Sequence, residues 1–208
     1  MAQVLKEEAR IAIIQAAKQE FLEKGYKGAS MRSIASKAHM TVGNLYRYYK
    51  NKEDINLSIV APTFKEIDQA LKSLTSNDVS METRVFNLKP NVNQLRDKLD
   101  DFADKLVEIY FKHKTEFNIL MLHSRLNEEM TEFFSELIKT MISESFVLEG
   151  LNKDRDTLSR AYAESLFEGL QVLFKNGDSD KGVLKVLIKT YLHSYVYMLD
   201  TDIRKFVQ

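Results

Sequence analysis

Apolar residues recur every three or four positions along most of this chain, which is the spacing of one face of an α-helix. In the first such segment Ile13, Ala16, Ala17 and Phe21 share a face. Gly25 follows this segment and is placed to end the helix. The pattern predicts an amphipathic first helix that buries this face.

Two short helices are expected next. Ser30 is an expected N-cap for the first of them, which turns Ile34 inward, and Thr41 is an expected N-cap for the second, which turns Leu45 inward. A turn around residues 38–40 separates them. This arrangement predicts a helix-turn-helix, in which two short helices cross steeply.

Longer helices are expected over the rest of the chain. Asn51 is placed to cap a helix over about residues 52–73, with Asp54 reaching back, and Pro62 predicts a kink or a break inside it. The polar stretch 75–91 reads as the longest loop. Further helices are expected at about residues 93–113, 115–125, 130–142, 156–175 and 180–199. The predicted fold is all-α with about nine helices.

The composition supports this interpretation. Only two prolines and seven glycines occur in 208 residues, which suits long helices better than sandwiches or barrels. The absence of cysteine excludes disulfides, cysteine nucleophiles and cysteine-ligated metals. No segment approaches the run of about 18 apolar residues that spans a membrane. We therefore expect a soluble, cytoplasmic protein without a membrane partner.

The charges are unevenly distributed although the chain as a whole is neutral. Residues 1–60 contain ten Lys and Arg against six Asp and Glu, a net charge of +4, and the remainder carries −4. A basic head on an acidic body favours contact of one end with a polyanion.

Polar and cationic residues gather on the outward face of the second short helix. Thr41, Asn44, Tyr46 and Arg47 lie there, and Tyr48 and lysines follow. Hydroxyls and cations hold phosphates, whereas Asn and Arg also read base edges. Gly43 costs about 1 kcal/mol within a helix relative to Ala, and close approach of a sugar-phosphate backbone would explain it. Spacing alone leaves open an ordinary pair of packed helices.

Residues 10–55 resemble the TetR (tetracycline-repressor-like) family of bacterial regulators. The matching positions lie in one register: Arg10, Ile13, Ala16, Ala17, Phe21, Gly25, Tyr26, Ser30, Ile34, Ala35, Ala38, Gly43, Leu45, Tyr46, Tyr48, Tyr49 and Lys52. The resemblance implies a DNA-binding domain over residues 1–50 and a helical effector-binding and dimerisation domain over residues 51–208.

The resemblance also implies a function. We expect a ligand-responsive transcriptional regulator, a repressor in the usual case, whose homodimer binds a pseudo-palindromic double-stranded DNA operator. Carried over by position, the residues that hold phosphates would be Ser30, Thr41, Tyr46, Tyr48 and Lys52, and those that face the groove would be Arg32, Val42, Gly43, Asn44 and Arg47.

The turn departs from the family pattern. The family commonly has Gly followed by Val where this chain has His39 and Met40. Glycine suits a turn that needs a positive φ, and His is among the other residues that tolerate it. The sequence therefore predicts a positive φ at His39.

The body is rich in aromatic residues and Met, which suits ordinary core packing and also the wall of a pocket for a small, largely apolar effector. Candidate pocket residues are Phe102, Tyr110, Phe117, Met121, Phe134, Met141 and Phe167. The last two helices carry apolar rows, and the family implies dimerisation through them. Candidate interface residues are Leu158, Tyr162, Leu166, Gly169, Leu184, Leu187, Tyr191 and Tyr195.

Catalytic chemistry has no support in the sequence. The four His are not spaced as metal ligands, and no phosphate-binding loop, dinucleotide fingerprint or serine-hydrolase motif occurs. We expect no enzyme activity, no cofactor and no metal. Two alternatives stay open: a dimeric helical small-molecule-binding protein without a promoter role, and a regulator controlled by a protein partner.

Overall fold

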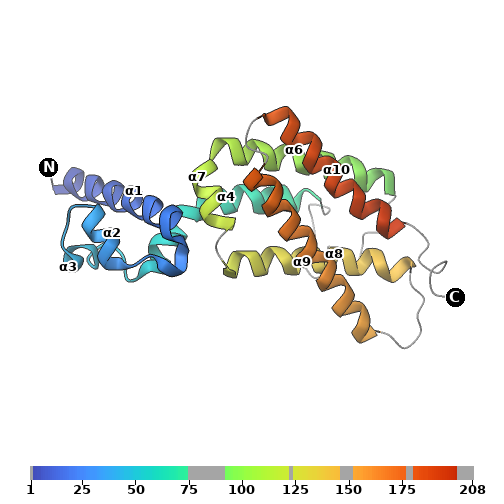
Figure 1. The fold of residues 1–208 in the computed structure, drawn as a ribbon, viewed down its shortest axis with the longest axis horizontal. Helices are drawn as coiled ribbons and strands as arrows, with labels where there is room; N and C mark the ends of the chain where they lie inside the picture. Colours follow the sequence, from blue (N-terminus) through green and yellow to red (C-terminus); the bar gives the residue numbers. More distant parts are fainter. Residues whose placement is uncertain (1, 75–91, 122–123, 146–151, 177–179, 201–208) are drawn as a thin grey trace. The chain divides into compact units, whose positions relative to one another are not determined.

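The computed structural model describes residues 2–74, 92–121, 124–145, 152–176 and 180–200, and the regular structure among them is α-helical (Figure 1). The expected all-α class is confirmed, whereas the loop expected at residues 75–91 lies outside the described residues. The helices are α1 (Ala2–Gly28), α2 (Met31–Lys37), α3 (Val42–Leu45), α4 (Lys52–Lys72), α6 (Val92–Lys112), α7 (Lys114–Met121), α8 (Ser124–Ser145), α9 (Asn152–Asn176) and α10 (Lys181–Asp200).

The contacts divide the chain into two compact units. The first comprises residues 1–66 and 112–124, and the second comprises residues 67–111 and 125–208. The N-terminal unit therefore extends along α4 and takes in α7. The domain boundary expected at residue 50 stays a prediction.

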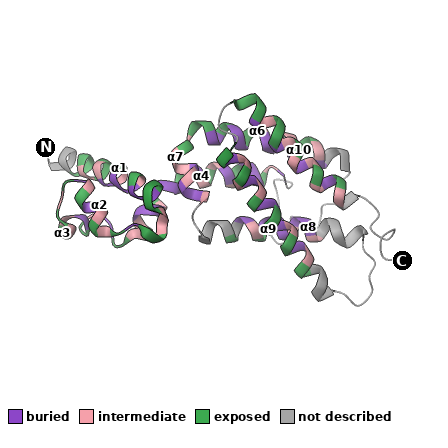
Figure 2. Ribbon diagram, viewed as in Figure 1, coloured by how far each residue is buried: buried purple, intermediate pink, exposed green. Residues whose placement is uncertain are grey.

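The core of the first unit is built from the apolar face of α1. Ile13, Ala17 and Phe21 are buried there, as the sequence pattern predicts (Figure 2). Helix α7 packs on α1, where it buries Phe117. An ion pair between the Lys18 ammonium and a carboxylate of α7 joins the same two helices. Helix α7 is thus part of the packing that supports the N-terminal helices.

Helix α4 begins as the sequence predicts. The amide of Asp54 donates to Asn51 Oδ1 at 2.8 Å, and Asp54 Oδ2 accepts from the amide of Lys50 at 3.0 Å. These two bonds satisfy amides at the helix start, which lack partners within the helix. The helix runs unbroken from Lys52 to Lys72, so the break considered at Pro62 does not occur.

Helix α6 contacts α8, α9 and α10 in the second unit. Phe102 of α6 meets Phe134 of α8 at a ring separation of 6.3 Å, and the hydroxyl of Tyr110 donates to the carbonyl of Phe174 in α9 at 3.2 Å. Acidic residues of α6 pair with lysines spaced four apart on α10. Lys185 Nζ lies 3.1 Å from Glu108 Oε1, and further pairs join the same helices. None of the described helices is long and apolar enough to cross a lipid bilayer.

Candidate nucleic-acid interface

Helix α2 is held at its start by two reciprocal bonds. The amide of Ser33 donates to Ser30 Oγ at 3.1 Å, and the amide of Ser30 donates to Ser33 Oγ at 3.2 Å. This capping box confirms the predicted cap at Ser30, and it adds a role for Ser33 that the sequence reasoning missed. Ile34 and Ala35 then lie fully buried on the inner face. The outer face of α2 is left to exposed residues such as Arg32.

The turn between α2 and α3 has the backbone geometry that the sequence predicts. Ala38 ends α2, and His39 follows with φ of 53°. The amide of Met40 donates back to the carbonyl of Ala35 at 3.0 Å. Thr41 then caps α3, because its hydroxyl accepts from the amide of Asn44 at 3.2 Å. The two short helices are therefore joined and capped by bonds made within residues 30–45.

The predicted DNA-contact residues gather on these two helices and the segments that flank them. Six of them are exposed: Ser30, Arg32, Thr41, Gly43, Tyr46 and Arg47. Four are half-buried: Val42, Asn44, Tyr48 and Lys52. Leu45 is fully buried, so it anchors α3 while the polar residues face outward. The surface combines hydroxyls, an amide and cations, which are the groups that bind phosphates and base edges in nucleic acids.

Gly43 is not needed for the packing of this chain. A Cβ added there would meet no heavy atom within 4 Å, and the residue lies inside a helix. Glycine costs about 1 kcal/mol in a helix relative to Ala. The open space above Gly43 therefore favours an external partner whose close approach a side chain would hinder.

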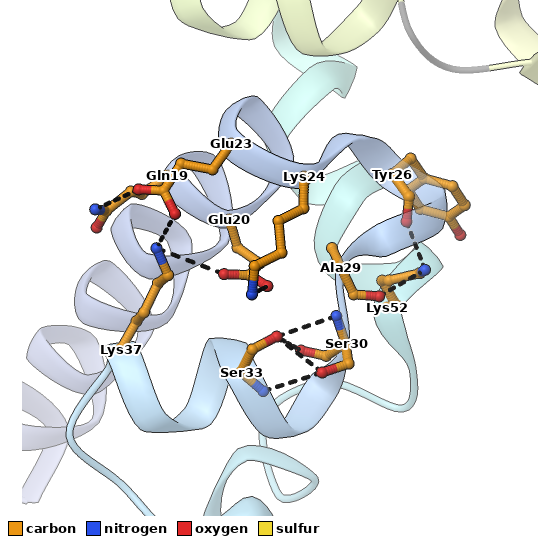
Figure 3. A network of polar contacts seen from close by, with 10 residues as sticks. All are labelled: Gln19, Glu20, Glu23, Lys24, Tyr26, Ala29, Ser30, Ser33, Lys37 and Lys52. Atoms are coloured by element: carbon orange, nitrogen blue, oxygen red, sulfur yellow. Dashed lines mark hydrogen bonds and ion pairs between the residues drawn. The ribbon is translucent and has the colours of Figure 1, made fainter.

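A buried carboxylate fixes α1 against α2. Glu20 is fully buried, lies 2.7 Å from Lys24 Nζ and faces Lys37 Nζ of α2 at 3.5 Å (Figure 3). Burial alone would raise the pKa of Glu20, but the bonds to Lys24, Ser33 and Lys37 outweigh it and hold that pKa below its ordinary value. The Lys37 ammonium also lies 2.5 Å from Glu23. The Lys37 ammonium is therefore paired with two carboxylates of α1.

The ammonium of Lys52 is also bound within the protein, in this case by backbone carbonyls. Its Nζ donates to the carbonyl of Tyr26 at 2.5 Å and to the carbonyl of Ala29 at 2.9 Å. The same ammonium lies 4.5 Å from the centre of the Tyr26 ring. The sequence indicated a cation here but gave no sign of these carbonyl partners, because they lie at the end of α1 and just after it, more than 20 residues earlier in the chain.

Three other cations of this surface lack such partners in the part of the chain that the structure describes: Arg32, Arg47 and Lys50. All three are exposed, and within the described residues no ion pair engages their side chains. These are the cations that the surface leaves available to a polyanion.

Comparison with known proteins places this helix-turn-helix in a family. The model for bacterial regulatory proteins of the tetR family matches residues 13–59. Residues 13–59 are thus similar to the DNA-binding segment of TetR-family regulators. It is similar to the HTH-type transcriptional repressor KstR of Rhodococcus jostii, with 30% identity over 88 residues. That alignment spans 38% of this chain and 42% of the repressor.

Solved structures of the TetR family share the fold. A protein described as a TetR-family transcriptional regulator, from Syntrophomonas wolfei, gives a TM-score of 0.57 at 16% identity, covering 92% of this chain and 96% of that one. A TetR-like transcriptional regulator from Rhodococcus sp. RHA1 gives 0.53 at 16% identity, covering 88% and 92%. At such identity the likeness establishes the fold alone.

The candidate pocket residues lie in both units. Phe102, Tyr110, Phe134 and Phe167 are buried in the second unit, and Phe117 is buried in the first. Met121 is half-buried in the first unit, and the side chain of Met141 lies outside the described residues. The structure places the described aromatic residues in packed core, and their role toward an effector stays a prediction.

The candidate interface residues on α9 and α10 are placed unevenly. Leu166 and Leu184 are buried within the chain, and Leu187 is 41% exposed. The other five are half-buried: Leu158, Tyr162, Gly169, Tyr191 and Tyr195. The hydroxyl of Tyr191 donates to the carbonyl of Ser165 at 2.8 Å, so part of this row is used between α9 and α10 of one chain.

These helices carry a second, exposed apolar row, of which the sequence indicated only Leu187. Its members are 41–69% exposed: Val172 on α9 and Val183, Val186, Leu187 and Tyr197 on α10. On α10 these positions follow helical spacing and face away from the buried row that contains Leu184 and Ile188. The side-chain type of the three valines does not separate them from core positions.

Proposed function

We propose that this protein is a ligand-responsive repressor of the TetR family. Its homodimer binds a pseudo-palindromic operator and is released by a small, largely apolar effector. The observation that carries the proposal is the α2–turn–α3 surface, which is capped internally and presents Arg32, Asn44 and Arg47 on its outer side.

The chemistry of this surface suits double-stranded DNA. The exposed Thr41 hydroxyl accepts from the amide of Asn44 and still has its hydrogen to donate to a phosphate. The Ser30 hydroxyl would have to exchange its 2.8 Å bond to Ser33 Oγ for such a contact. Asn44 and Arg47 have the side chains that read base edges in the major groove. Gly43 adds a position at which a backbone can approach closely. Tyr46 and Tyr48 supply further hydroxyls at the end of α3.

Dimerisation through α9 and α10 is supported by the exposed apolar row of Val172, Val183, Val186 and Leu187. Contiguous exposed apolar residues are typical of an interface. A twofold contact would use the same row on both copies. Two heads would then meet successive major grooves with centres about 34–36 Å apart.

The test is selection of bound sites from a random duplex library with purified protein at about physiological salt. The proposal expects enrichment of one inverted repeat, whose half-site spacing reflects the separation of the two heads. Failure of folded protein to enrich any sequence, with and without cell extract, would refute it. The enriched duplex then provides a release assay for candidate effectors.

A further inference from the structure

Two carbonyls, one in the last turn of α1 and one just after it, have no helical amide as a partner within the described residues. Gly25 adopts φ of 68° and ψ of 169°, which interrupts the helical path before the last turn. In a continuous helix the carbonyl of Tyr26 would accept from the amide of Ser30, and the carbonyl of Ala29 from the amide of Ser33. Both of these amides are instead donated to the capping box of α2.

The Lys52 side chain takes the place of the two missing amide donors. Its Nζ donates to both carbonyls, at 2.5 Å and 2.9 Å, above the face of the Tyr26 ring (Figure 3). The carbonyl end of a helix carries partial negative charge, which a lysine ammonium complements. The capping box that starts α2 thus binds the two amides, and the lysine that starts α4 binds the two carbonyls that would have paired with them in a continuous helix.

The backbone of Lys52 is itself held in place. It is the first residue of α4, next to Asn51, which caps that helix through the amide of Asp54. A lysine on a fixed helix start therefore reaches the segment that leads directly into Ser30. Through this one side chain, the beginning of α4 is tied to the entry of the helix-turn-helix.

We propose that Lys52 is a positioning residue that sets the placement of α2 and α3, and with it the discrimination between operator and other DNA. This inference rests on the proposed function and assigns to Lys52 a role other than a simple phosphate contact. Two of the three N–H groups of the ammonium already serve carbonyls, and the side chain is half-buried. Lys50 is the natural comparison, because it is an exposed cation two residues away.

The test compares two duplexes of equal length, the one enriched from the library and one of scrambled sequence, over a series of salt concentrations. Lys52→Met is expected to weaken binding of the enriched duplex by about tenfold, the loss typical of one misplaced base contact, and to change binding of the scrambled duplex by less than about twofold. Lys50→Met is the matched control. It is expected to weaken both duplexes alike and to make the salt dependence less steep by about 0.9 per lost contact.

Two further variants separate positioning from charge and from folding. Lys52→Arg keeps a donor to both carbonyls and is expected to restore most of the discrimination. Tyr26→Leu keeps the charge at position 52 but removes the ring beneath it, so it is expected to lower discrimination in the same direction as Lys52→Met. It also serves if Lys52→Met does not fold.

Three results would overturn the inference. Equal weakening of both duplexes by Lys52→Met, with a reduced salt dependence, would make Lys52 a phosphate contact like Lys50. A lower melting temperature with both affinities unchanged would make it a merely structural residue. Failure of the wild-type protein to enrich any duplex would refute the proposed function itself, and would be seen before any variant is compared.

Discussion

The contact between α9 and α10 can be tested with one substitution, Gly169→Ala, whose effect on the free energy of unfolding is expected to change sign when Tyr191 is removed. Gly169 of α9 lies against Tyr191 of α10, and a Cβ added at Gly169 would lie 2.0 Å from the Tyr191 hydroxyl oxygen. No pair of such atoms approaches so closely, so Gly169→Ala must displace the ring. The displaced hydroxyl would lose its bonds to the carbonyl of Ser165 at 2.8 Å and to the Tyr195 hydroxyl at 3.1 Å.

The magnitude follows from these contacts. Two neutral hydrogen bonds contribute about 0.5–1.5 kcal/mol each, and the edge-on contact of Tyr191 with Tyr195 contributes about 0.5–1.5 kcal/mol more. Replacing Gly by Ala inside a helix returns about 1 kcal/mol. Gly169→Ala should therefore lower the free energy of unfolding by about 1–3 kcal/mol. In a Tyr191→Ala background the same substitution should raise it by about 0.5–1 kcal/mol, because only the helix preference remains.

The assay is a double-mutant cycle by urea denaturation at one fixed protein concentration, which keeps any contribution of self-association constant. A destabilising Gly169→Ala that is equally destabilising in the Tyr191→Ala background would refute the reasoning, because the cost would then not come from Tyr191. A neutral effect in both backgrounds would show that the ring moves aside without losing its bonds.

Three further predictions concern the N-terminal unit. Gly43→Ala should raise the melting temperature, since Ala is favoured by about 1 kcal/mol in a helix, yet weaken binding of the enriched duplex; unchanged binding in a titration would contradict a close approach at Gly43. His39→Gly should keep the fold and stabilise it by up to ~1 kcal/mol, because φ of 53° strains a residue with a side chain, and a clearly lower melting temperature would count against that turn. Glu20→Gln should cost about 1–3 kcal/mol at pH 7, where the buried carboxylate is bonded to cations. Because the folded-state pKa of Glu20 is lowered from 4.5, its contribution is present above that value and is lost as pH falls further, so the wild-type and variant unfolding energies should converge in acid. A difference that stays constant from pH 7 to pH 3 would rule out a role for the ionised form.

Features of the site that depend on neighbours in sequence were predictable. Ser30, Thr41 and Asn51 cap their helices because a short side chain can reach an amide three residues later, which is a purely local rule. The positive φ of His39 was implied by the resemblance, because the family commonly has Gly at this position and His tolerates the same backbone geometry.

Features that depend on packing between distant segments were not predictable from one sequence. The carbonyls that Lys52 binds belong to residues 23 and 26 positions earlier, and only the tertiary structure brings them together. Val183 and Val186 look like core residues by type, and only the packing of α10 against its neighbours leaves them exposed. Helix α7 joins the N-terminal unit for the same reason, although more than 40 residues separate it from α4.

The most direct measurement for the central claim is a map of backbone amide chemical shifts while the enriched duplex is titrated into the full-length protein. The proposed function predicts the largest changes in residues 30–48, including Arg32, Asn44 and Arg47, with two protein chains bound to each duplex. Changes concentrated in α8 to α10, with residues 30–48 unaffected, would contradict it.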